Sequence, residues 1–250
     1  MGESYSRITG VKAILLDLHE TITEVHEDIP SITRRVSHAG GVDLSNISDN
    51  QLNIAMERVI EWINPYQIEN DVDIRFGSEI GHWTQANRIM YEALGIEGLS
   101  DEELDFIEQI WKEELKTWEK IRSDAISTLT ELKNRGYVLG ICTRRTDDPT
   151  ELLKKWGILN LLSTIQWTSV PGYAKPSPYT LILAAEEIDV NPWRCAYVGN
   201  RVDADIDAAV RAGMVPILTT WADLEEAKKA PQGTYIIKEI SELLELFPKK

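Results

Sequence analysis

The stretch VKAILLDLHET, residues 11–21, decides how the rest of this sequence is interpreted. Its first six residues are apolar apart from Lys12, and such a short apolar run predicts a buried β-strand. The run ends abruptly in polar side chains, among them Asp17, His19 and Thr21. A cluster of polar groups is therefore expected at the carboxyl end of a strand.

Strands and helices alternate again in the second half of the chain. Apolar runs predict strands at about 137–142, 164–168, 195–198 and 215–219, and helical periodicity predicts helices at about 124–134, 149–156, 178–187 and 204–212. Strands that alternate with helices are joined by right-handed parallel crossovers. The sequence therefore predicts an α/β fold built on a doubly wound parallel sheet.

The segment between these two parts has a different pattern. Apolar residues recur at helical spacing, as in Leu52, Ala55, Met56 and Val59, without an intervening strand. We expect an all-helical insert at residues 23–120, and a core domain formed by residues 1–22 and 121–250.

Composition excludes several classes of partner. The 250 residues include 26 Lys and Arg against 41 Asp and Glu, so the formal net charge is −15. Such a field repels nucleic acid and anionic membrane surfaces, whereas a small phosphorylated molecule is still possible where local cations or a metal invert the field. No window approaches the ~18 apolar residues of a membrane span, and the start lacks a signal peptide's apolar stretch. We expect a cytoplasmic protein, monomeric or homodimeric.

The binding crevice of an open parallel sheet lies beyond the carboxyl ends of its strands. Four such ends carry residues capable of chemistry. They are Asp17 with His19 and Thr21, Thr143 with Arg144 and Arg145, the loop that ends in Lys175-Pro176, and Gly199-Asn200 with Asp203 and Asp205.

In this order, the four groups resemble the motifs of the haloacid dehalogenase (HAD) superfamily, whose members are mostly phosphatases. The first motif, Asp-x-Asp-x-Thr, resembles residues 17–21 with His19 in the place of the second Asp. The other three resemble Thr143, Lys175, and Gly199-Asn200 followed by Asp205, with Asn200 in the place of an Asp. The fold that this resemblance implies is a Rossmann-like core with a C1-type helical cap.

The resemblance also implies a mechanism. Asp17 would attack phosphorus and form an aspartyl-phosphate, which divides one difficult displacement into two. Thr143 would hold the phosphoryl oxygens, and Lys175 would balance the charge gathered there. Mg²⁺ would be held by the Asp17 carboxylate, the His19 carbonyl and oxygens of the loop that contains Asn200 and Asp205.

Substrate contacts are expected from five further side chains. In the core they are Thr21, Arg144 and Arg145. In the helical insert they are Arg75 and His82.

Two departures from the family pattern fall on the chemistry. Imidazole has an unperturbed pKa of ~6.5, so His19 is a chemically possible acid and base. Asn200 is a neutral ligand, and we expect weak Mg²⁺ binding that Asp203 and Asp205 partly rescue.

Two alternatives to a phosphatase stay open. In a metal-independent 2-haloacid dehalogenase, Asp17 would attack carbon and expel halide. The first motif of that family is similar to Asp-x-Tyr-Gly-Thr and its fourth motif has a serine pair, and neither occurs here. A binding protein with attenuated or lost catalysis would keep the fold alone.

Overall fold

The computed structural model describes residues 7–70, 82–145 and 147–249. The chain divides into two compact units, one formed by Met1–Glu24 with Lys120–Lys250 and the other by Val25–Glu119. The sequence places the two domain boundaries after residues 22 and 120, and the compact units divide after residues 24 and 119.

The first unit is built on a sheet of six strands in the order β5-β4-β1-β6-β7-β8. Each strand is parallel to its neighbours, which confirms the predicted doubly wound α/β class. The strands are β1 (Ala13–Leu16), β4 (Val138–Thr143), β5 (Leu162–Trp167), β6 (Cys195–Gly199), β7 (Val215–Thr219) and β8 (Tyr235–Ile237).

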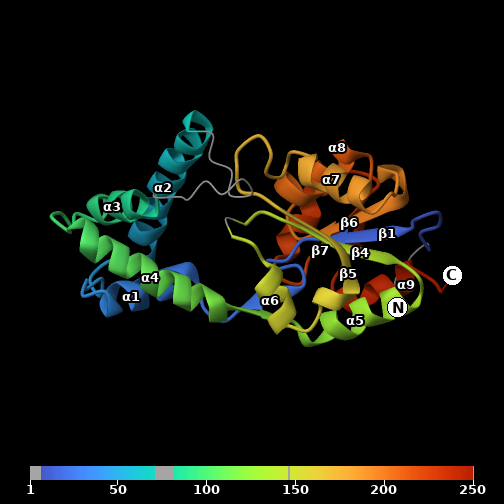
Figure 1. Cartoon of the computed structure of the whole chain (residues 1–250), viewed down its shortest axis with the longest axis horizontal. Helices are drawn as coiled ribbons and strands as arrows, with labels where there is room; N and C mark the ends of the chain where they lie inside the picture. The colour runs from blue at the N-terminus through green and yellow to red at the C-terminus, as the bar shows by residue number, and fades with distance from the viewer. Residues whose placement is uncertain (1–6, 71–81, 146, 250) are drawn as a thin grey trace. The chain divides into compact units, whose positions relative to one another are not determined.

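Helices cover both faces of this sheet (Figure 1). On one face, α5 (Ser123–Asn134) and α9 (Leu243–Leu246) pack against Ile14 and Leu16 of β1. On the other, α7 (Tyr179–Glu187) and α8 (Asp207–Ala212) pack against Leu15. Because both faces are covered, the central strand is apolar at every position, and this is the origin of the apolar run in the sequence.

Shorter helices complete the connections. They are α6 (Thr150–Lys155) and the 3-10 helices Leu159–Leu161, Pro192–Arg194, Leu224–Lys229 and Ile240–Glu242.

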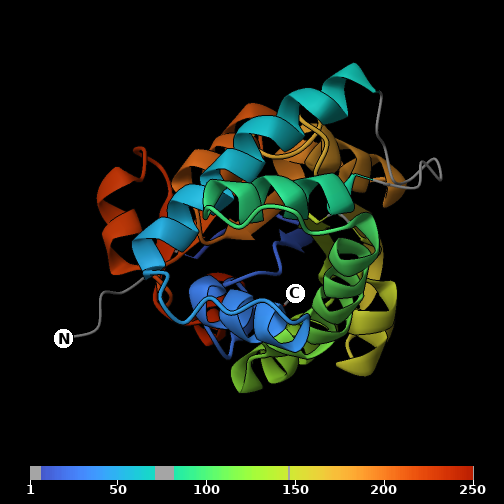
Figure 2. The same cartoon turned by 90° about the vertical axis from the view of Figure 1, so that its left-hand side faces the viewer.

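The second unit contains the predicted helical insert. Its helices are α1 (Ile29–Ala39), α2 (Asp49–Glu69), α3 (Trp83–Ala93) and α4 (Asp101–Trp118). They share a core of their own, and α2 and α3 lie side by side in both views (Figures 1 and 2). Ser100 begins α4 with a capping box, in which its side chain and that of Glu103 bond each other's backbone amides. No helix in the described part of the chain is both long and apolar enough to cross a membrane.

One feature of the boundary between the two units was not predicted. The short strands β2 (Thr23–Val25) and β3 (Glu119–Ile121) pair as a separate two-stranded sheet where the chain enters and leaves the insert. Residues 23–25 and 119–121, at the two ends of the predicted helical insert, are therefore strand. Three-residue strands have too little pattern to be identified without their partner.

Candidate active site

Three of the predicted site residues meet at the carboxyl edge of the sheet. Asp17 follows β1, and Asp205 lies in a π-helix, η4 (Val202–Ile206), that follows β6. Because β1 and β6 pair in register, their ends bring these loops together. Lys175 reaches both from the loop after β5, with its Nζ 2.7 Å from Asp17 Oδ1 and 2.5 Å from Asp205 Oδ1.

All three charged groups are buried. Asp17 and Lys175 are 5 % exposed and Asp205 is 2 % exposed. Burial raises the pKa of Asp17, and Asp205 adds to this while Lys175 opposes it. Burial also acts to lower the pKa of Lys175, but the two carboxylates outweigh burial and hold that pKa above its ordinary value. With all three side chains ionised, Asp17, Lys175 and Asp205 together carry a net charge of −1, which favours the binding of a cation beside them.

Asp205 is held by the backbone that surrounds it. Its Oδ2 accepts hydrogen bonds from the amides of Asn200 at 3.1 Å and Arg201 at 3.0 Å. Gly199 allows this approach, because a Cβ at that position would lie 2.3 Å from the Asp205 Cβ. Single π-helical turns such as η4 are frequent at functional sites. Both carboxylate oxygens of Asp205 are thus engaged by the protein, and its role as a metal ligand stays a prediction.

The loop after β1 turns tightly around one carbonyl. The Leu18 oxygen accepts hydrogen bonds from the amides of Thr21, Ile22 and Thr23, each at 3.1 Å. Glu20 has a φ of 51°, a left-handed conformation that costs a non-glycine residue about 1 kcal/mol. The turn brings the motif threonine to Asn200, with Thr21 Oγ1 3.4 Å from Asn200 Oδ1. Glu20 Oε2 lies 3.4 Å from the same side chain's Nδ2.

The two arginines after β4 differ in their partners. Thr143, the last residue of β4, is buried, and its carbonyl accepts the Thr168 amide at 3.3 Å. Arg145 is paired with Asp147, Nε to Oδ1 at 2.9 Å. Arg144 is exposed and has no ion-pair partner among the residues that the structure describes. Of the two, Arg144 therefore has the guanidinium available for a ligand.

Sequence reasoning missed two residues at this edge, Tyr197 and Trp221. The Trp221 indole N–H donates to the Thr21 carbonyl at 3.1 Å, and the Arg122 guanidinium lies 4.2 Å from the centre of its ring. The position of Trp221, two residues after β7, was the only available signal. Tyr197 lies inside β6, and its hydroxyl at a buried strand position was the signal.

The structure says little about the two substrate contacts predicted in the helical insert, Arg75 and His82. Arg75 lies outside the described residues. His82 is 2 % exposed, and its ring lies 5.3 Å from that of Tyr66 and 4.8 Å from that of Trp83. Its two nitrogens have no hydrogen-bond partner within the described part of the chain, and burial lowers its pKa to about 4. A role for His82 in substrate binding stays a prediction.

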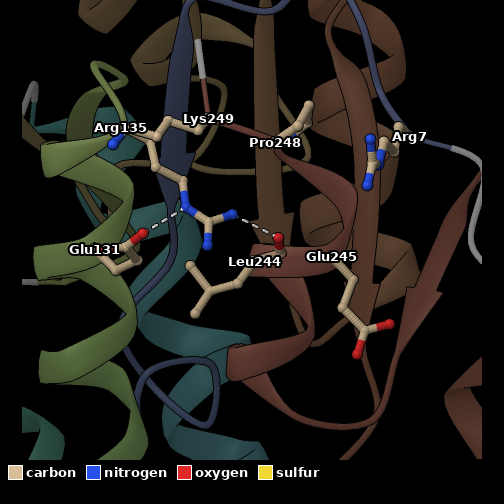
Figure 3. Close-up of a pocket in the computed structure, with 7 residues that line it drawn as sticks. All are labelled: Arg7, Glu131, Arg135, Leu244, Glu245, Pro248 and Lys249. Atoms are coloured by element: carbon tan, nitrogen blue, oxygen red, sulfur yellow. Dashed lines mark hydrogen bonds and ion pairs between the residues drawn. The ribbon is translucent and has the colours of Figure 1, made fainter.

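A surface pocket lies at the opposite edge of the sheet, where β4 begins (Figure 3). Arg135 crosses it, donating to Glu131 at 2.8 Å and to the Leu244 carbonyl at 2.6 Å. It also donates to the Phe247 carbonyl at 2.8 Å. These bonds cap the end of α9, so the pocket's central cation serves the structure of the C-terminus.

Comparison with known proteins gives this geometry a context. A family model described as haloacid dehalogenase-like hydrolase matches residues 11–213. A glyceraldehyde 3-phosphate phosphatase of Methanopyrus kandleri is 37 % identical over 95 residues, 38 % of this chain and 41 % of the relative. A protein of the same name from Methanothermobacter thermautotrophicus is 31 % identical over 125 residues, 48 % of this chain and 55 % of the relative. The chain thus spans about half the length of these two relatives.

A solved structure shows the same fold over nearly the whole chain. It is described as a predicted phosphoglycolate phosphatase from Haemophilus somnus, and it superposes with a TM-score of 0.66 at 19 % identity. The superposition covers 96 % of this chain and 99 % of that one. At this identity, the likeness concerns the fold alone.

Proposed function

The chain belongs to the haloacid dehalogenase-like hydrolase family, and on that premise we propose that it is a phosphatase that hydrolyses a small phosphate monoester through a phosphoryl-aspartate at Asp17. The observation that carries the proposal is the buried contact of Lys175 with Asp17 and Asp205 at the carboxyl edge of the sheet. The two relatives named as phosphatases support it.

The first step transfers the phosphoryl group to the protein. Lys175 holds Oδ1 of Asp17, which leaves Oδ2 as the oxygen that attacks phosphorus. As the new P–O bond forms, the bond to the substrate's alcohol oxygen breaks, and His19 donates a proton to that leaving oxygen. In the second step His19 takes a proton from water, the resulting hydroxide attacks phosphorus, and inorganic phosphate leaves Asp17.

The phosphoryl oxygens need donors while this occurs. The hydroxyl of Thr143 and the backbone amides that follow it are at the correct edge of the sheet. The hydroxyl of Thr21, in the loop after β1, is already used within the protein, because it donates to the Asn200 amide oxygen at 3.4 Å. Phosphoryl transfer depends mainly on such positioning and on charge neutralisation.

The oxygen atoms at this edge of the sheet suit Mg²⁺ as ligands, but few of them carry a negative charge. The Asp17 carboxylate, the His19 carbonyl and the Asn200 amide oxygen form an all-oxygen donor set, which this hard cation prefers. Only one of them is a carboxylate, because both oxygens of Asp205 are already bonded within the protein. Among the described residues no group of three or more His, Cys, Asp or Glu side chains is arranged to hold a metal. When bound, Mg²⁺ would neutralise charge on the phosphoryl oxygens, and we expect its affinity to be low.

The substrate class follows from the relatives and from Arg144. Glyceraldehyde 3-phosphate, named in two relatives, is a phosphate ester of a short polar chain. Phosphoglycolate, named in another relative from Xylella fastidiosa, is shorter and adds a carboxylate. The unpaired guanidinium of Arg144 suits a carboxylate, since it offers two parallel donors. We therefore propose a short phosphorylated acid or aldehyde.

Hydrolysis of p-nitrophenyl phosphate, with and without Mg²⁺, tests the reaction. Asp17→Asn should reduce turnover at least about a thousandfold, because removing a nucleophile removes the covalent route. The control is Glu151→Gln, which changes an exposed carboxylate paired with Lys154 and should retain full turnover. His19→Asp, which restores the usual family residue, should retain activity and increase its Mg²⁺ dependence. Phosphatase activity that survives in Asp17→Asn would eliminate the proposed nucleophile.

The substrate panel decides between the remaining classes. Phosphoglycolate and glyceraldehyde 3-phosphate should be hydrolysed, and Arg144→Ala should raise KM for phosphoglycolate more than Arg145→Ala does. Chloride release from chloroacetate that is insensitive to a chelator would instead assign a dehalogenase. No turnover of any of these compounds would favour a binding protein.

A further inference from the structure

Tyr197 places a hydroxyl group in a position that otherwise belongs to the apolar core. The residue is completely buried, and its ring packs with Leu15 and Leu181 between the sheet and α7. A phenylalanine would fill nearly the same volume without a polar atom. A buried hydroxyl is unfavourable unless it is hydrogen-bonded, so its partners indicate what it does.

The hydroxyl has two close partners with opposite roles. It donates to the Cys142 carbonyl at 2.7 Å and accepts from Lys175 Nζ at 2.8 Å. Cys142 lies within β4, so its carbonyl direction is fixed by the strand. Of the two acceptors near the phenolic proton, the Cys142 carbonyl at 2.7 Å is closer than Asp205 Oδ1 at 3.4 Å, so the proton faces the carbonyl and an oxygen lone pair faces the lysine.

The N–H donors of Lys175 equal in number the oxygen acceptors around Nζ. A lysine ammonium has three N–H donors and no acceptor. Three oxygens surround Nζ: Asp17 Oδ1 at 2.7 Å, Asp205 Oδ1 at 2.5 Å and Tyr197 Oη at 2.8 Å. Each donor thus has one acceptor.

We propose that Tyr197 is a positioning residue that fixes the direction of the Lys175 ammonium, so that the lysine holds the nucleophile Asp17 in place. This inference rests on the proposed function. Loss of the Tyr197 hydroxyl should therefore slow turnover and leave substrate binding unchanged.

Tyr197→Phe tests this, with Tyr137→Phe as the matched control. Tyr137 is also a buried tyrosine of the same unit, and its hydroxyl also donates to a backbone carbonyl, that of Pro248 at 3.0 Å. It lies just before β4, at the opposite edge of the sheet. Both variants delete a hydroxyl that donates to a backbone carbonyl, and only Tyr197→Phe also removes the acceptor of a lysine N–H.

The expected result is a split between kinetic constants. In Tyr197→Phe, kcat should fall about tenfold, corresponding to one hydrogen bond of ~1.4 kcal/mol. KM and inhibition by inorganic phosphate should stay within about twofold. In Tyr137→Phe, all three should be unchanged. An unchanged kcat in Tyr197→Phe, or a parallel change in KM and phosphate inhibition, would overturn the inference.

Crystal structures of the wild type and Tyr197→Phe give a readout that does not depend on activity. In the wild type Nζ should contact Asp17, and in the variant it should leave Asp17 or occupy two positions. An Nζ that stays in place without the hydroxyl would also overturn the inference. An inactive wild type would defeat the proposed function alone, and the position of Nζ would still decide the role of Tyr197.

Discussion

The carboxyl edge of the sheet and the core of the helical insert both bury ionisable side chains, but they satisfy them differently. At the sheet edge, Lys175 has three oxygen acceptors, two of them carboxylates. In the insert, His82 lies among aromatic rings and has no hydrogen-bond partner within the described residues. The carboxylates thus keep the Lys175 ammonium charged despite its burial, whereas burial without such partners keeps His82 neutral. Partners, and not burial alone, decide which groups are charged at neutral pH.

Removing the cation from the first region should have the largest effect on stability. Lys175→Met leaves Asp17 and Asp205 buried next to each other without a counter-charge, which should lower the free energy of unfolding by about 3–5 kcal/mol. Urea denaturation at pH 7 measures this. In the control, Lys154→Met, a largely exposed pair with Glu151 is removed, and the change should be within ~0.5 kcal/mol. Equal effects in the two variants would show that the buried contact is not what stabilises this edge.

Overpacking beside Asp205 should have the next largest effect. Gly199→Ala places a methyl group 2.3 Å from the Asp205 Cβ, so the carboxylate must shift, and we expect a loss of about 2–3 kcal/mol together with most of the turnover. Gly140→Ala is the control, because its Cβ would lie 2.4 Å from Thr164 Cγ2 within the sheet. It should lose stability while the turnover of the folded fraction is retained. Full activity in Gly199→Ala would contradict the role assigned to the Asp205 position.

The stability of the helical insert should depend on pH, because His82 is buried there. The pKa of His82 is lowered from 6.5 to about 4 by burial, so between these values the unfolded chain binds a proton that the folded chain does not. The stability that neutral His82 provides is complete above pH ~6.5 and is lost as pH falls towards 4. His82→Phe should remove this dependence, worth on the order of 1–2 kcal/mol.

Urea midpoints at pH 7.5 and 4.5 would show the effect as a smaller difference between the two pH values in His82→Phe than in the wild type. The control is His38→Phe, which changes an exposed histidine of the same unit. If both variants keep the pH dependence of the wild type, the charge of His82 is not what destabilises the insert in acid.

The smallest effect is expected for Trp221. Trp221→Phe keeps a ring beside Arg122 but loses the indole N–H bond to the Thr21 carbonyl, which should cost about 1 kcal/mol and slow turnover a few-fold. Trp193→Phe is the control, since Arg194 also lies over its ring, 5.4 Å from the centre, and the residue is largely exposed. Stopped-flow or steady-state assays would detect the difference. A larger loss in Trp193→Phe would refute the role of the indole bond.

Several predictions from the sequence depended on local pattern, and these agree best with the structure. The apolar run before Asp17 is the central strand, with its four strand residues completely buried. The predicted strand at 215–219 has the bounds of β7, Val215–Thr219. By contrast, β8 (Tyr235–Ile237) was missed, because three residues at a sheet edge have little pattern until they pair with β7.

The residues of the candidate site also divide into those that the sequence predicted and those that it did not. Asp17, Lys175 and Asp205 could be selected from the sequence, because each follows a predicted strand and parallel strands end at one edge. Tyr197 has a weaker signal, a hydroxyl inside a predicted strand, and that hydroxyl has a role only through Lys175 and Cys142. The sequence does not indicate that the amides of Asn200 and Arg201 occupy the second oxygen of Asp205.

The sequence by itself determined the class of fold, the order of its elements and the loops that contain polar side chains, because these depend on the periodicity of neighbouring residues. Only the tertiary structure decided which oxygen accepts which proton. Lys175 Nζ and Asp17 Oδ1 are 2.7 Å apart although 158 positions separate the two residues. Hydrogen bonds depend on fractions of an ångström and on direction, and these are set by the packing of the whole sheet.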